Sequence, residues 1–465
     1  MGAALTGLVL CPGDPGWDDA RRNFNQRFDV QPRAVVYCQD TGDVVRAIRW
    51  ARENRVPLRA RSGRHSYEGY SLIDGGLIID VSDIDHVRVD REAGVADIGA
   101  GIDMLECSER LGEVGVTTPL ATGPTVGMAG LALGGGFGLT SRKFGLTCDN
   151  LLEVELVTAN GEVIRAGESA HPDLFWACRG GGGGNFGIAT QFRLRVHPVT
   201  VVCGFIIQWN WDQFDRVVAR WQTWAHDVDD GLSAALRMTV AREIRLYGIY
   251  APDDPVGVSK AADLLAPLLQ AVPPASPPTI QTLPFLVAAR MFFGEGGHTV
   301  DPQQPVWTVN PYSDQQIFKS TSAAAMAPFP PEAIALLRGF LENPPPLAQT
   351  PVQVSMVQLL PGGGAPSRVA PSATAVYLRQ AMLIVQYDGY WVAPQDAGPT
   401  MAWVEQMRTA MQPYTQGAYV NYVDSQIPDA LRAYYGANLE RLVEVKRRYD
   451  PDDVFHFPQS IPLSL

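Results

Sequence analysis

Two glycine-rich segments constrain the fold of this chain more than any other feature. One is the stretch from Ser62 to Ser66, and the other runs from Thr122 to Gly138. Glycine lets a backbone curl so that successive N–H groups point inward, and it lets a large ligand approach without meeting a Cβ atom. A single glycine-rich loop is as often an ordinary turn as it is a ligand-binding loop. Two such loops, each entered from a strand, favour a site where main-chain amides hold an anionic group such as a diphosphate.

A third glycine run, Gly180 to Gly184, contains the formal pattern G-x-G-x-x-G at Gly182, Gly184 and Gly187. A dinucleotide-binding fingerprint follows a strand and opens a helix. Here the pattern follows a helical turn at 172–178 and opens a strand, so it does not indicate that kind of site. The chain also lacks G-x-x-x-x-G-K-[ST], which argues against NTP hydrolysis.

The charge balance and the hydropathy limit the partners of this chain. It carries 49 Asp and Glu against 37 Lys and Arg, a net charge of −12, without the basic stripe that nucleic acid requires. No apolar run approaches the roughly 18 residues that span a bilayer, and no basic segment opens the chain. We therefore expect no nucleic acid, no membrane partner and a cytoplasmic location. Six scattered cysteines without a His/Cys cluster predict neither a disulfide framework nor a metal site.

Helical and strand patterns alternate in the first 200 residues. Apolar residues at helical spacing predict a helix over 43–54, and short apolar runs predict strands at 58–61, 77–81 and 188–196. The segment 151–166 is typical of a hairpin, and its Asn160-Gly161 turn has the composition of a type I′ turn.

Proline-rich stretches mark connections in the rest of the chain. At roughly 150 residues per domain, 465 residues predict two or three domains. Proline is dense after residue 252, where such runs are poor helix or strand interiors. We expect parts at 1–200, 201–410 and 411–465. The middle part is predicted to hold strands at 353–360 and 382–387 and helices at 259–269 and 332–341.

Several motifs together carry a resemblance to a known family. They are Arg61 to Ser66, Gly123 to Gly127 with Gly134 to Gly136, Trp176 to Ile188, and the closing motifs Tyr419 to Asp424 and Gln459 to Pro462. They resemble the berberine-bridge-enzyme-like FAD-linked oxidases of the vanillyl-alcohol-oxidase/p-cresol-methylhydroxylase (PCMH) superfamily. The resemblance implies an α+β, two-domain PCMH-type FAD-binding fold. Its FAD domain comprises 1–200 with the closing segment 411–465, and its substrate domain, 201–410, is an antiparallel sheet backed by helices.

The resemblance implies one covalent bond between the protein and FAD. His65 stands where the family has a histidine bonded to the flavin 8α-methyl group. Many members add a second bond from a cysteine of the other loop, where this chain has Gly123, which cannot form a thioether. We therefore expect a single bond, through His65, which fixes the ring and makes the flavin a stronger oxidant.

Further cofactor contacts are implied by the same motifs. Besides His65, the residues expected to bind FAD are Arg61, Ser62, Gly63, Arg64, Ser66, Gly123, Thr125, Val126, Gly127, Gly130, Gly134, Gly135, Gly187, Ile188, Asn421 and Gln459. In the family the position of Val126 influences the access of oxygen to the flavin, and valine resembles the oxidase version. We therefore expect an oxidase that produces hydrogen peroxide.

The catalytic base is expected among polar side chains near the flavin. The family often uses a tyrosine of the closing Tyr-x-Asn-Tyr strand, here Tyr419 or Tyr422. Their odd spacing places them on opposite faces of a strand, so at most one faces the flavin, and Tyr422 is preferred. A tyrosine pKa of about 10 must be lowered before the group acts as a base near neutral pH. Gln353 and Gln358 are candidates for a polar partner, and Phe144 occupies the place of a second tyrosine found in some members.

The expected activity is oxidation of an alcohol or related C–H/O–H group of a small organic substrate, with O₂ as acceptor and H₂O₂ as product. Sugars, phenolic compounds and specialised metabolites are all substrates in the family. Two alternatives remain open: a flavin-dependent non-redox cyclase or isomerase, and a dehydrogenase that uses another electron acceptor. We expect a monomer or a homodimer.

Overall fold

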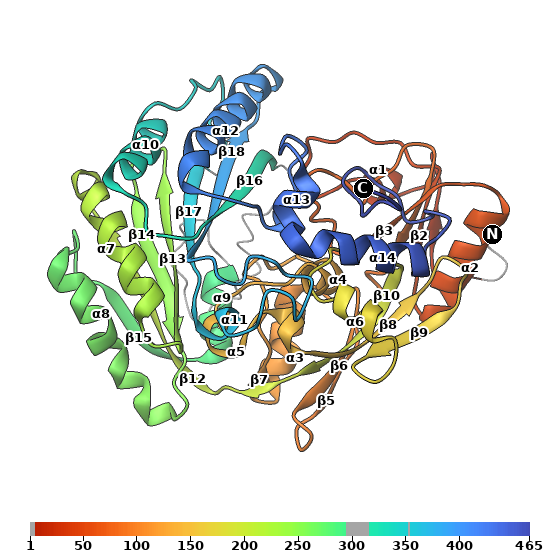
Figure 1. The fold of residues 1–465 in the computed structure, drawn as a ribbon, viewed down its shortest axis with the longest axis horizontal. Helices are drawn as coiled ribbons and strands as arrows, with labels where there is room; N and C mark the ends of the chain where they lie inside the picture. Colours follow the sequence, from red (N-terminus) through yellow and green to blue (C-terminus); the bar gives the residue numbers. More distant parts are fainter. Residues whose placement is uncertain (1–4, 294–315, 352–353) are drawn as a thin grey trace.

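The computed structural model describes residues 5–293, 316–351 and 354–465, and they form two halves that lie side by side (Figure 1). One half contains the N-terminal part of the chain, drawn in red to yellow, and the C-terminal segment, drawn in dark blue. The other half contains the middle of the chain, drawn in green to light blue. Both chain ends therefore lie in the same half.

A four-stranded sheet carries the first glycine-rich loop. Its order is β1 (Val9–Leu10), β2 (Ala34–Tyr37), β4 (Leu77–Asp80) and β3 (Leu58–Arg61), and the last three strands are parallel. Helix α2 (Thr41–Glu53) connects β2 to β3, and the Asp40 side chain caps it by accepting from the Asp43 amide. The predicted helix at 43–54 and strands at 58–61 and 77–81 are confirmed. Residues 62–66 leave the carboxyl end of β3, the edge where parallel sheets place their ligand loops.

A five-stranded antiparallel sheet packs beside it, and it contains the predicted hairpin. Its order is β5 (Val87–Asp90), β6 (Val95–Gly99), β10 (Ile188–Arg195), β8 (Leu151–Val157) and β9 (Val163–Gly167). The hairpin turn differs from the prediction. A type I′ turn needs positive φ at two residues, whereas here Gly161 has φ +71° and Asn160 does not lie in the left-handed region. The Gly161 amide donates to the Thr158 carbonyl at 2.9 Å, so a tight turn ends in one left-handed glycine.

Short helices and the C-terminal segment complete this half. They are α1 (Trp17–Ala20), α3 (Met104–Glu113), α4 (Met128–Leu133), α5 (Ser141–Phe144), α6 (Pro172–Ala177), α13 (Ala430–Tyr435) and α14 (Leu439–Tyr449), with β7 (Val116–Thr117) paired to β11 (His197–Pro198). The third glycine run is a loop between α6 and β10, as predicted. Lys446 of α14, fully buried, donates to the Asn185 carbonyl at 3.0 Å and pairs with Asp450 at 2.7 Å. This contact fastens the C-terminal segment to that loop.

The other half is built on a seven-stranded sheet in which all neighbouring strands are antiparallel. Its order is β15 (Thr279–Pro284), β12 (Val201–Trp209), β14 (Ile244–Tyr250), β13 (Leu232–Thr239), β17 (Met356–Pro361), β18 (Leu383–Trp391) and β16 (Ile317–Ala325). The helices of this half are α7 (Phe214–Asp227), α8 (Lys260–Ala271), α9 (Phe285–Phe293), α10 (Pro331–Glu342), α11 (Gly364–Ser367) and α12 (Ala397–Met411). In Figure 1, α7, α8, α10 and α12 lie along the outer face of the sheet. The expected antiparallel sheet backed by helices is therefore confirmed.

Strand pairing separates an apolar from a polar face of this sheet. Leu236, Leu359 and Val385 are paired neighbours on β13, β17 and β18, and all are fully buried in the core beneath the outer helices. The next residues, Arg237 and Gln358, are also paired, and Gln358 pairs with Gln386. Because successive side chains of a strand alternate between faces, this second row turns toward the other half of the molecule.

Two hydrophobic clusters account for most of the described core. The larger one draws on both glycine-rich regions and on the C-terminal segment, including Leu442 and Ile461. The other runs from Cys203 to Met411 and contains Trp221 and Tyr387. The larger cluster also takes residues from within that range, such as Ala235, Ile249 and Leu360. The division into three parts at 200 and 410 therefore stays a prediction.

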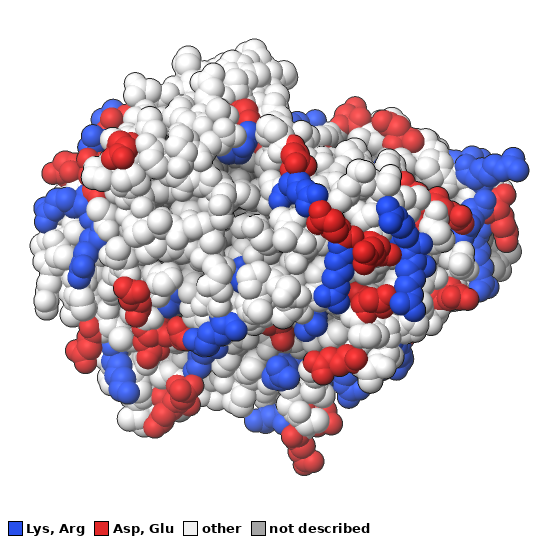
Figure 2. Space-filling model, viewed as in Figure 1, with Lys and Arg blue, Asp and Glu red and all other residues white. Residues whose placement is uncertain are grey.

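The surface shows no broad region of one charge on the face drawn in Figure 2. Acidic and basic side chains are interspersed there, most densely over the half that holds α13 and α14. Among the residues that the structure describes, no helix combines the length and apolar character needed to cross a bilayer.

Candidate functional site

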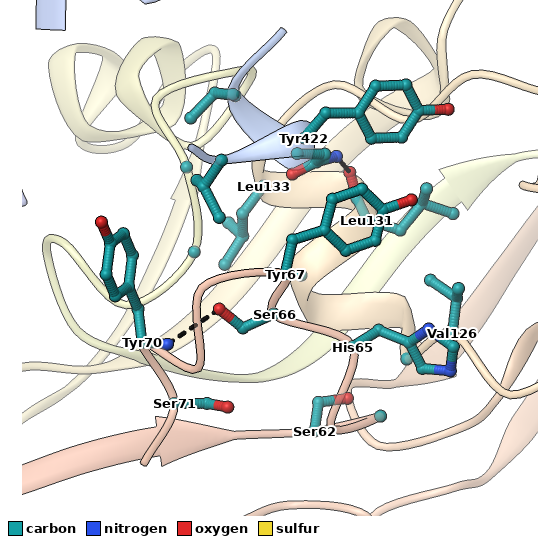
Figure 3. A pocket seen from close by; sticks show the side chains of 18 of the residues that line it. Ser62, His65, Ser66, Tyr67, Tyr70, Ser71, Val126, Leu131, Leu133 and Tyr422 are labelled. Atoms are coloured by element: carbon teal, nitrogen blue, oxygen red, sulfur yellow. Dashed lines mark hydrogen bonds between the residues drawn. The ribbon is translucent and has the colours of Figure 1, made fainter. Parts of the chain in front are cut away.

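A cavity of about 360 Å³ lies where the polar face of the seven-stranded sheet meets the glycine-rich loops. The first loop, the second loop and the third glycine run line one side, and the residues after Ala418 close another. The sheet contributes Arg237, Tyr247, Gln358, Gln386 and Asp388. Figure 3 shows His65 and Tyr67, from one stretch of chain, gathered in this cavity with Tyr422 of the C-terminal segment.

Two glycines allow the first and second loops to touch main chain to main chain. A Cβ atom built on Gly63 would lie 2.1 Å from the Gly127 amide nitrogen. One built on Gly127 would lie 2.2 Å from Ser62 Oγ and 2.3 Å from the Gly63 nitrogen. Any side chain at these positions would force the loops apart, so the glycines fix how close the two lining segments approach.

His65 sits at this junction with its ring held on two sides. Its ring stacks on Phe24 with the centroids 4.0 Å apart, and its Nε2 lies 2.7 Å from Thr125 Oγ1. Burial lowers the pKa of His65 to about 3. The imidazole is therefore neutral near neutral pH, which leaves one ring nitrogen with a lone pair.

The other predicted residues of the first loop are held from behind by protein groups. Arg61 forms a fully buried ion pair with Asp80, and Ser62 Oγ donates to the Ala100 carbonyl at 2.8 Å. Arg64 adopts φ +62° and donates to the Tyr37 hydroxyl at 2.9 Å. The Tyr70 amide donates to Ser66 Oγ at 2.9 Å, drawn as a dashed line in Figure 3. These protein contacts fix the conformation of the loop.

The second loop supplies bare backbone to the cavity. Gly123, Val126, Gly127 and Gly130 all line it, and a Cβ built on Gly130 would meet nothing within 4 Å. A Cβ built on Gly123 would lie 2.9 Å from Val126 Cγ2, so a side chain at position 123 would crowd Val126, the residue expected to influence the access of oxygen.

Three predicted cofactor residues lie outside the cavity lining, namely Thr125, Gly134 and Gly135. A Cβ on Gly134 would come within 1.9 Å of Asn421 Oδ1, and one on Gly135 would lie 3.4 Å from the Tyr419 ring. These two glycines make room for the C-terminal segment. Thr125 reaches the cavity only through its hydrogen bond to His65.

The remaining predicted residues line the cavity from the third glycine run and the C-terminal segment. Gly187 and Ile188 lie at the start of β10, and Asn421 donates to the Leu131 carbonyl at 3.1 Å. Gln459 has φ +63° and donates to the Asp424 carbonyl at 2.8 Å. The glycine-rich loops and the C-terminal segment thus supply backbone amides, glycines and polar side chains to the lining, a set that suits a dinucleotide such as FAD.

The two tyrosines of the closing motif do not lie on a strand, which corrects the prediction. Val420–Tyr422 forms a single 3₁₀ turn, and Tyr419 immediately precedes it. Residues three apart eclipse in such a turn, so both rings line the cavity at an edge-to-face distance of 5.1 Å. The Tyr419 hydroxyl accepts from the Gly136 amide at 2.8 Å and from Asn421 at 3.0 Å, and burial raises the pKa of Tyr419.

Tyr422 forms a stacked pair with a residue that sequence reasoning missed, Tyr67. Their centroids are 5.5 Å apart with 7° between the ring planes, and Phe318 packs edge-on against Tyr67 at 5.3 Å. The buried Lys319 ammonium pairs with Glu68 at 2.9 Å and with Asp424. Lys319 follows Phe318 in the sequence, Glu68 follows Tyr67, and Asp424 lies two residues after Tyr422. These ion pairs therefore hold the three aromatic rings in place.

Phe144, in contrast, stacks on His197 with the ring centroids 4.0 Å apart and does not line the cavity.

Asp388 is the second group that sequence reasoning missed. It lines the cavity with 1% of its surface exposed, and it accepts hydrogen bonds from Ser320 and Gln386. Burial raises the pKa of Asp388 to about 6. The predicted strand at 382–387 ended four residues before β18 does, at Trp391, and so left out Asp388. The polar alternation Gln386, Asp388, Tyr390 was the signal that the strand continues.

The predicted residue Gln358 lies on the same sheet face, and the Tyr247 hydroxyl donates to its Oε1 at 2.6 Å. Gln386 Nε2 lies 3.4 Å from the Tyr67 hydroxyl and 3.1 Å from Asp388 Oδ2. Gln353 lies outside the described residues. The sheet therefore presents one carboxylate (Asp388), two amides (Gln358 and Gln386) and two phenols (Tyr247 and Tyr390) to the side of the cavity opposite the loops.

The fold and this cavity define a two-domain FAD-binding oxidoreductase, and comparisons with known proteins agree. A family model described as "FAD binding domain" matches residues 32–167, and one described as "Berberine and berberine like" matches residues 418–462. The FAD-linked oxidoreductase YgaK of Bacillus subtilis is 38% identical over 98% of this chain and 97% of its own length. The solved structure of Physcomitrella patens BBE-like 1 superposes with a TM-score of 0.90, at 30% identity over 99% of this chain and 98% of that one.

The chain belongs to the berberine-bridge-enzyme-like family of FAD-linked oxidoreductases. It is also similar to a relative named for its substrate, the xylooligosaccharide oxidase of Thermothelomyces thermophilus. The identity is 28%, over 96% of this chain and 90% of that protein. The predicted family, the PCMH-type fold and the enzyme class are therefore confirmed.

Proposed function

We propose that this enzyme is an oxidase of a small hydroxyl-bearing substrate, with FAD bonded covalently through His65 and O₂ as the electron acceptor. The observation that carries the proposal is a buried carboxylate, Asp388, on the polar sheet face of the cavity that also contains His65. Val126 in the cavity lining supports the choice of oxygen as acceptor, as does the similarity to a relative named as an oxidase.

The residues that would hold FAD are those of the three glycine-rich loops, with Asn421 and Gln459 from the C-terminal segment. Gly130 and Gly183 support this assignment, because both face open space. A Cβ built on Gly183 would meet only the Gly130 Cα, at 3.6 Å, and a Cβ built on Gly130 would meet nothing within 4 Å. Side chains there would fill the cradle. When bound, FAD supplies the hydride acceptor and returns the electrons to O₂. The neutral His65 imidazole is the group available to bond it.

Asp388 is the proposed general base. A pKa of about 6 leaves its carboxylate ionised at neutral pH yet close enough to the solution pH to take a proton from a substrate hydroxyl efficiently. Ser320 and Gln386 orient the carboxylate by donating to it. Tyr422 remains a candidate for contact with substrate, while the hydroxyl of Tyr419 is assigned a structural role because the Gly136 amide already donates to it.

The polar sheet face favours a substrate with several hydroxyl groups. Gln358, Gln386, Tyr247 and Arg237 line the cavity on neighbouring strands. Amides and phenols both donate and accept hydrogen bonds, so they match a hydroxyl-rich compound such as a carbohydrate better than an apolar one.

Oxygen consumption and peroxide release with a panel of mono- and oligosaccharides and simple alcohols test this proposal. We expect peroxide in equal amount to product for at least one carbohydrate, and loss of roughly 10²-fold or more in turnover for Asp388→Asn. Reduction of an artificial dye without peroxide would instead identify a dehydrogenase. Product formation without any electron acceptor would identify a non-redox enzyme.

A further inference from the structure

One nitrogen of the His65 ring is occupied by the protein and the other is not. Nε2 lies 2.7 Å from Thr125 Oγ1, and one face of the imidazole ring stacks on the Phe24 ring. Within the described part of the chain, Nδ1 has no hydrogen-bond partner, and the residue lines the cavity. The protein therefore leaves Nδ1 as the nitrogen open to a ligand.

Thr125 is itself held firmly by its neighbours. The Pro124 carbonyl accepts from the Leu105 amide at 2.9 Å, and the Val126 carbonyl accepts from the Met104 amide at 3.0 Å. Both amides belong to the first turn of α3, where such groups have no partner within the helix. The hydroxyl that contacts His65 is thus carried by a segment anchored on either side.

We propose, on the basis of the proposed covalent FAD linkage, that Thr125 is a positioning residue for the formation of that bond. Its hydroxyl holds Nε2 and thereby fixes the ring with Nδ1 toward the flavin 8α carbon. Thr125 does not line the cavity, so in this proposal it acts through its contact with His65.

A C–N bond forms between His65 Nδ1 and the 8α carbon, the 8α methyl group loses one hydrogen as a proton, and the imidazole loses the proton on Nε2. The two electrons of the broken C–H bond reduce the flavin, and O₂ then takes them together with the two protons to give H₂O₂. The proposed acceptor of the enzyme is therefore also the oxidant for its own modification.

A hydroxyl is suited to both states of the ring. Before the bond forms, the neutral ring with a free Nδ1 lone pair carries its proton on Nε2 and donates to Thr125 Oγ1. Afterwards Nε2 has a lone pair and no proton, and the threonine hydroxyl donates to it. The same side chain therefore holds the ring throughout, which a methyl group in its place cannot do.

Thr125→Val and Thr125→Ser test this inference in the full-length protein. Valine keeps the shape and removes the hydroxyl, while serine keeps the hydroxyl. The fraction of chains with FAD attached is measured by flavin fluorescence of the denatured polypeptide and by the mass of the peptide containing His65. We expect wild type and Thr125→Ser to carry the adduct, and the rate of attachment in Thr125→Val to fall by roughly tenfold, the scale of one lost hydrogen bond. Thr125→Ala is the second hydroxyl-free variant should Thr125→Val fold poorly.

The possible outcomes separate the inference from the function on which it rests. Attachment in Thr125→Val as fast as in wild type would overturn the role of Thr125 and leave the covalent linkage standing. A wild-type His65 peptide without FAD would overturn the linkage and the inference together. Slow attachment in Thr125→Val with FAD still bound before denaturation, and recovery in Thr125→Ser, would support the inference.

Discussion

At the scale of single residues, the carboxylate of Asp388 shows how burial and two neighbours set the behaviour of one group. Burial raises its pKa, whereas the hydrogen bonds from Ser320 and Gln386 lower it, and the balance gives a pKa of about 6. Sequence reasoning did not find this residue, because polar alternation indicates that a strand continues but does not mark one of its aspartates as a catalytic group. The pairing of β18 with β16, which brings Ser320 opposite Asp388, is a tertiary feature.

Ser320→Ala is expected to change the pH dependence of the enzyme. The Ser320 hydroxyl donates to the ionised form of Asp388, so its loss disfavours that form and raises the pKa of Asp388 above about 6. The acid limb of the kcat/KM profile should therefore move to higher pH by about one unit at most. Thr321→Val is the matched control, because Thr321 is the next residue of β16 and its side chain lies on the other face. An unchanged acid limb in Ser320→Ala would contradict the role of Asp388 as base.

Asp388→Asn is expected to stabilise the protein above pH 6 while it lowers turnover by roughly 10²-fold or more. The folded-state pKa of about 6 exceeds the ordinary value of 3.8, so the folded wild type binds the additional proton and loses stability as pH rises between these values. The amide does not ionise. Its free energy of unfolding should exceed that of wild type by up to about 3 kcal/mol at pH 8 and match it near pH 4. Chemical denaturation at both pH values is the measurement, and a difference independent of pH would contradict the assignment.

At the scale of elements, the glycine-rich loops were predictable and the closing turn was not. Glycine composition and the preceding strand indicated the loops, since few other residues permit such backbones. The closing Tyr-x-Asn-Tyr motif resembles an alternating strand, but its tyrosines instead share one side of a 3₁₀ turn. Ser322 on β16 accepts from the Tyr419 amide at 3.0 Å, a partner contact far away in sequence that local pattern does not reveal.

Gly127→Ala is expected to separate the first and second loops. The new Cβ would lie 2.2 Å from Ser62 Oγ and 2.3 Å from the Gly63 nitrogen, and main chain cannot yield cheaply. We expect a loss of about 2–3 kcal/mol in unfolding free energy and a protein purified with little flavin. Gly339→Ala in α10 is the control, because nothing lies within 4 Å of its Cβ, and it should stabilise that helix by up to about 1 kcal/mol. A fully flavin-loaded Gly127→Ala protein would show that the close loop contact is not required.

At the scale of the whole molecule, Arg142 ties one half to the other. It is buried on α5, and its guanidinium donates to the carbonyls of Leu232 at 3.1 Å and Val228 at 2.8 Å, and also to those of His226 and Gly362. All four carbonyls belong to the half built on the seven-stranded sheet. The cavity lies between the halves, so this contact helps to set the distance between the loops and the sheet.

Arg142→Met is expected to lower the unfolding free energy by about 2–4 kcal/mol, because it leaves buried carbonyls without donors. The matched control is Arg165→Met, whose side chain is 62% exposed and whose pairing with Glu155 should contribute less than about 1 kcal/mol. Denaturant titration followed by tryptophan fluorescence measures both. Equal, small effects of the two substitutions would show that the halves are held together elsewhere.

The two-domain architecture was predictable because its motifs stand at both ends of the chain and mark one FAD-binding half. The substrate side was not, because the face of a sheet that receives substrate depends on strand order, and the order β13, β17, β18, β16 joins strands far apart in sequence. Gln358 could be named from local alternation, but its neighbours Arg237 and Gln386 required the register.

The most direct test of the account is the flavin content of the wild-type polypeptide after acid precipitation and washing. A covalent oxidase with its tether at His65 predicts about one flavin per chain in the precipitate, and none in the precipitate of His65→Ala prepared in the same way. A colourless wild-type precipitate, with all flavin released to the supernatant, would contradict the proposed site.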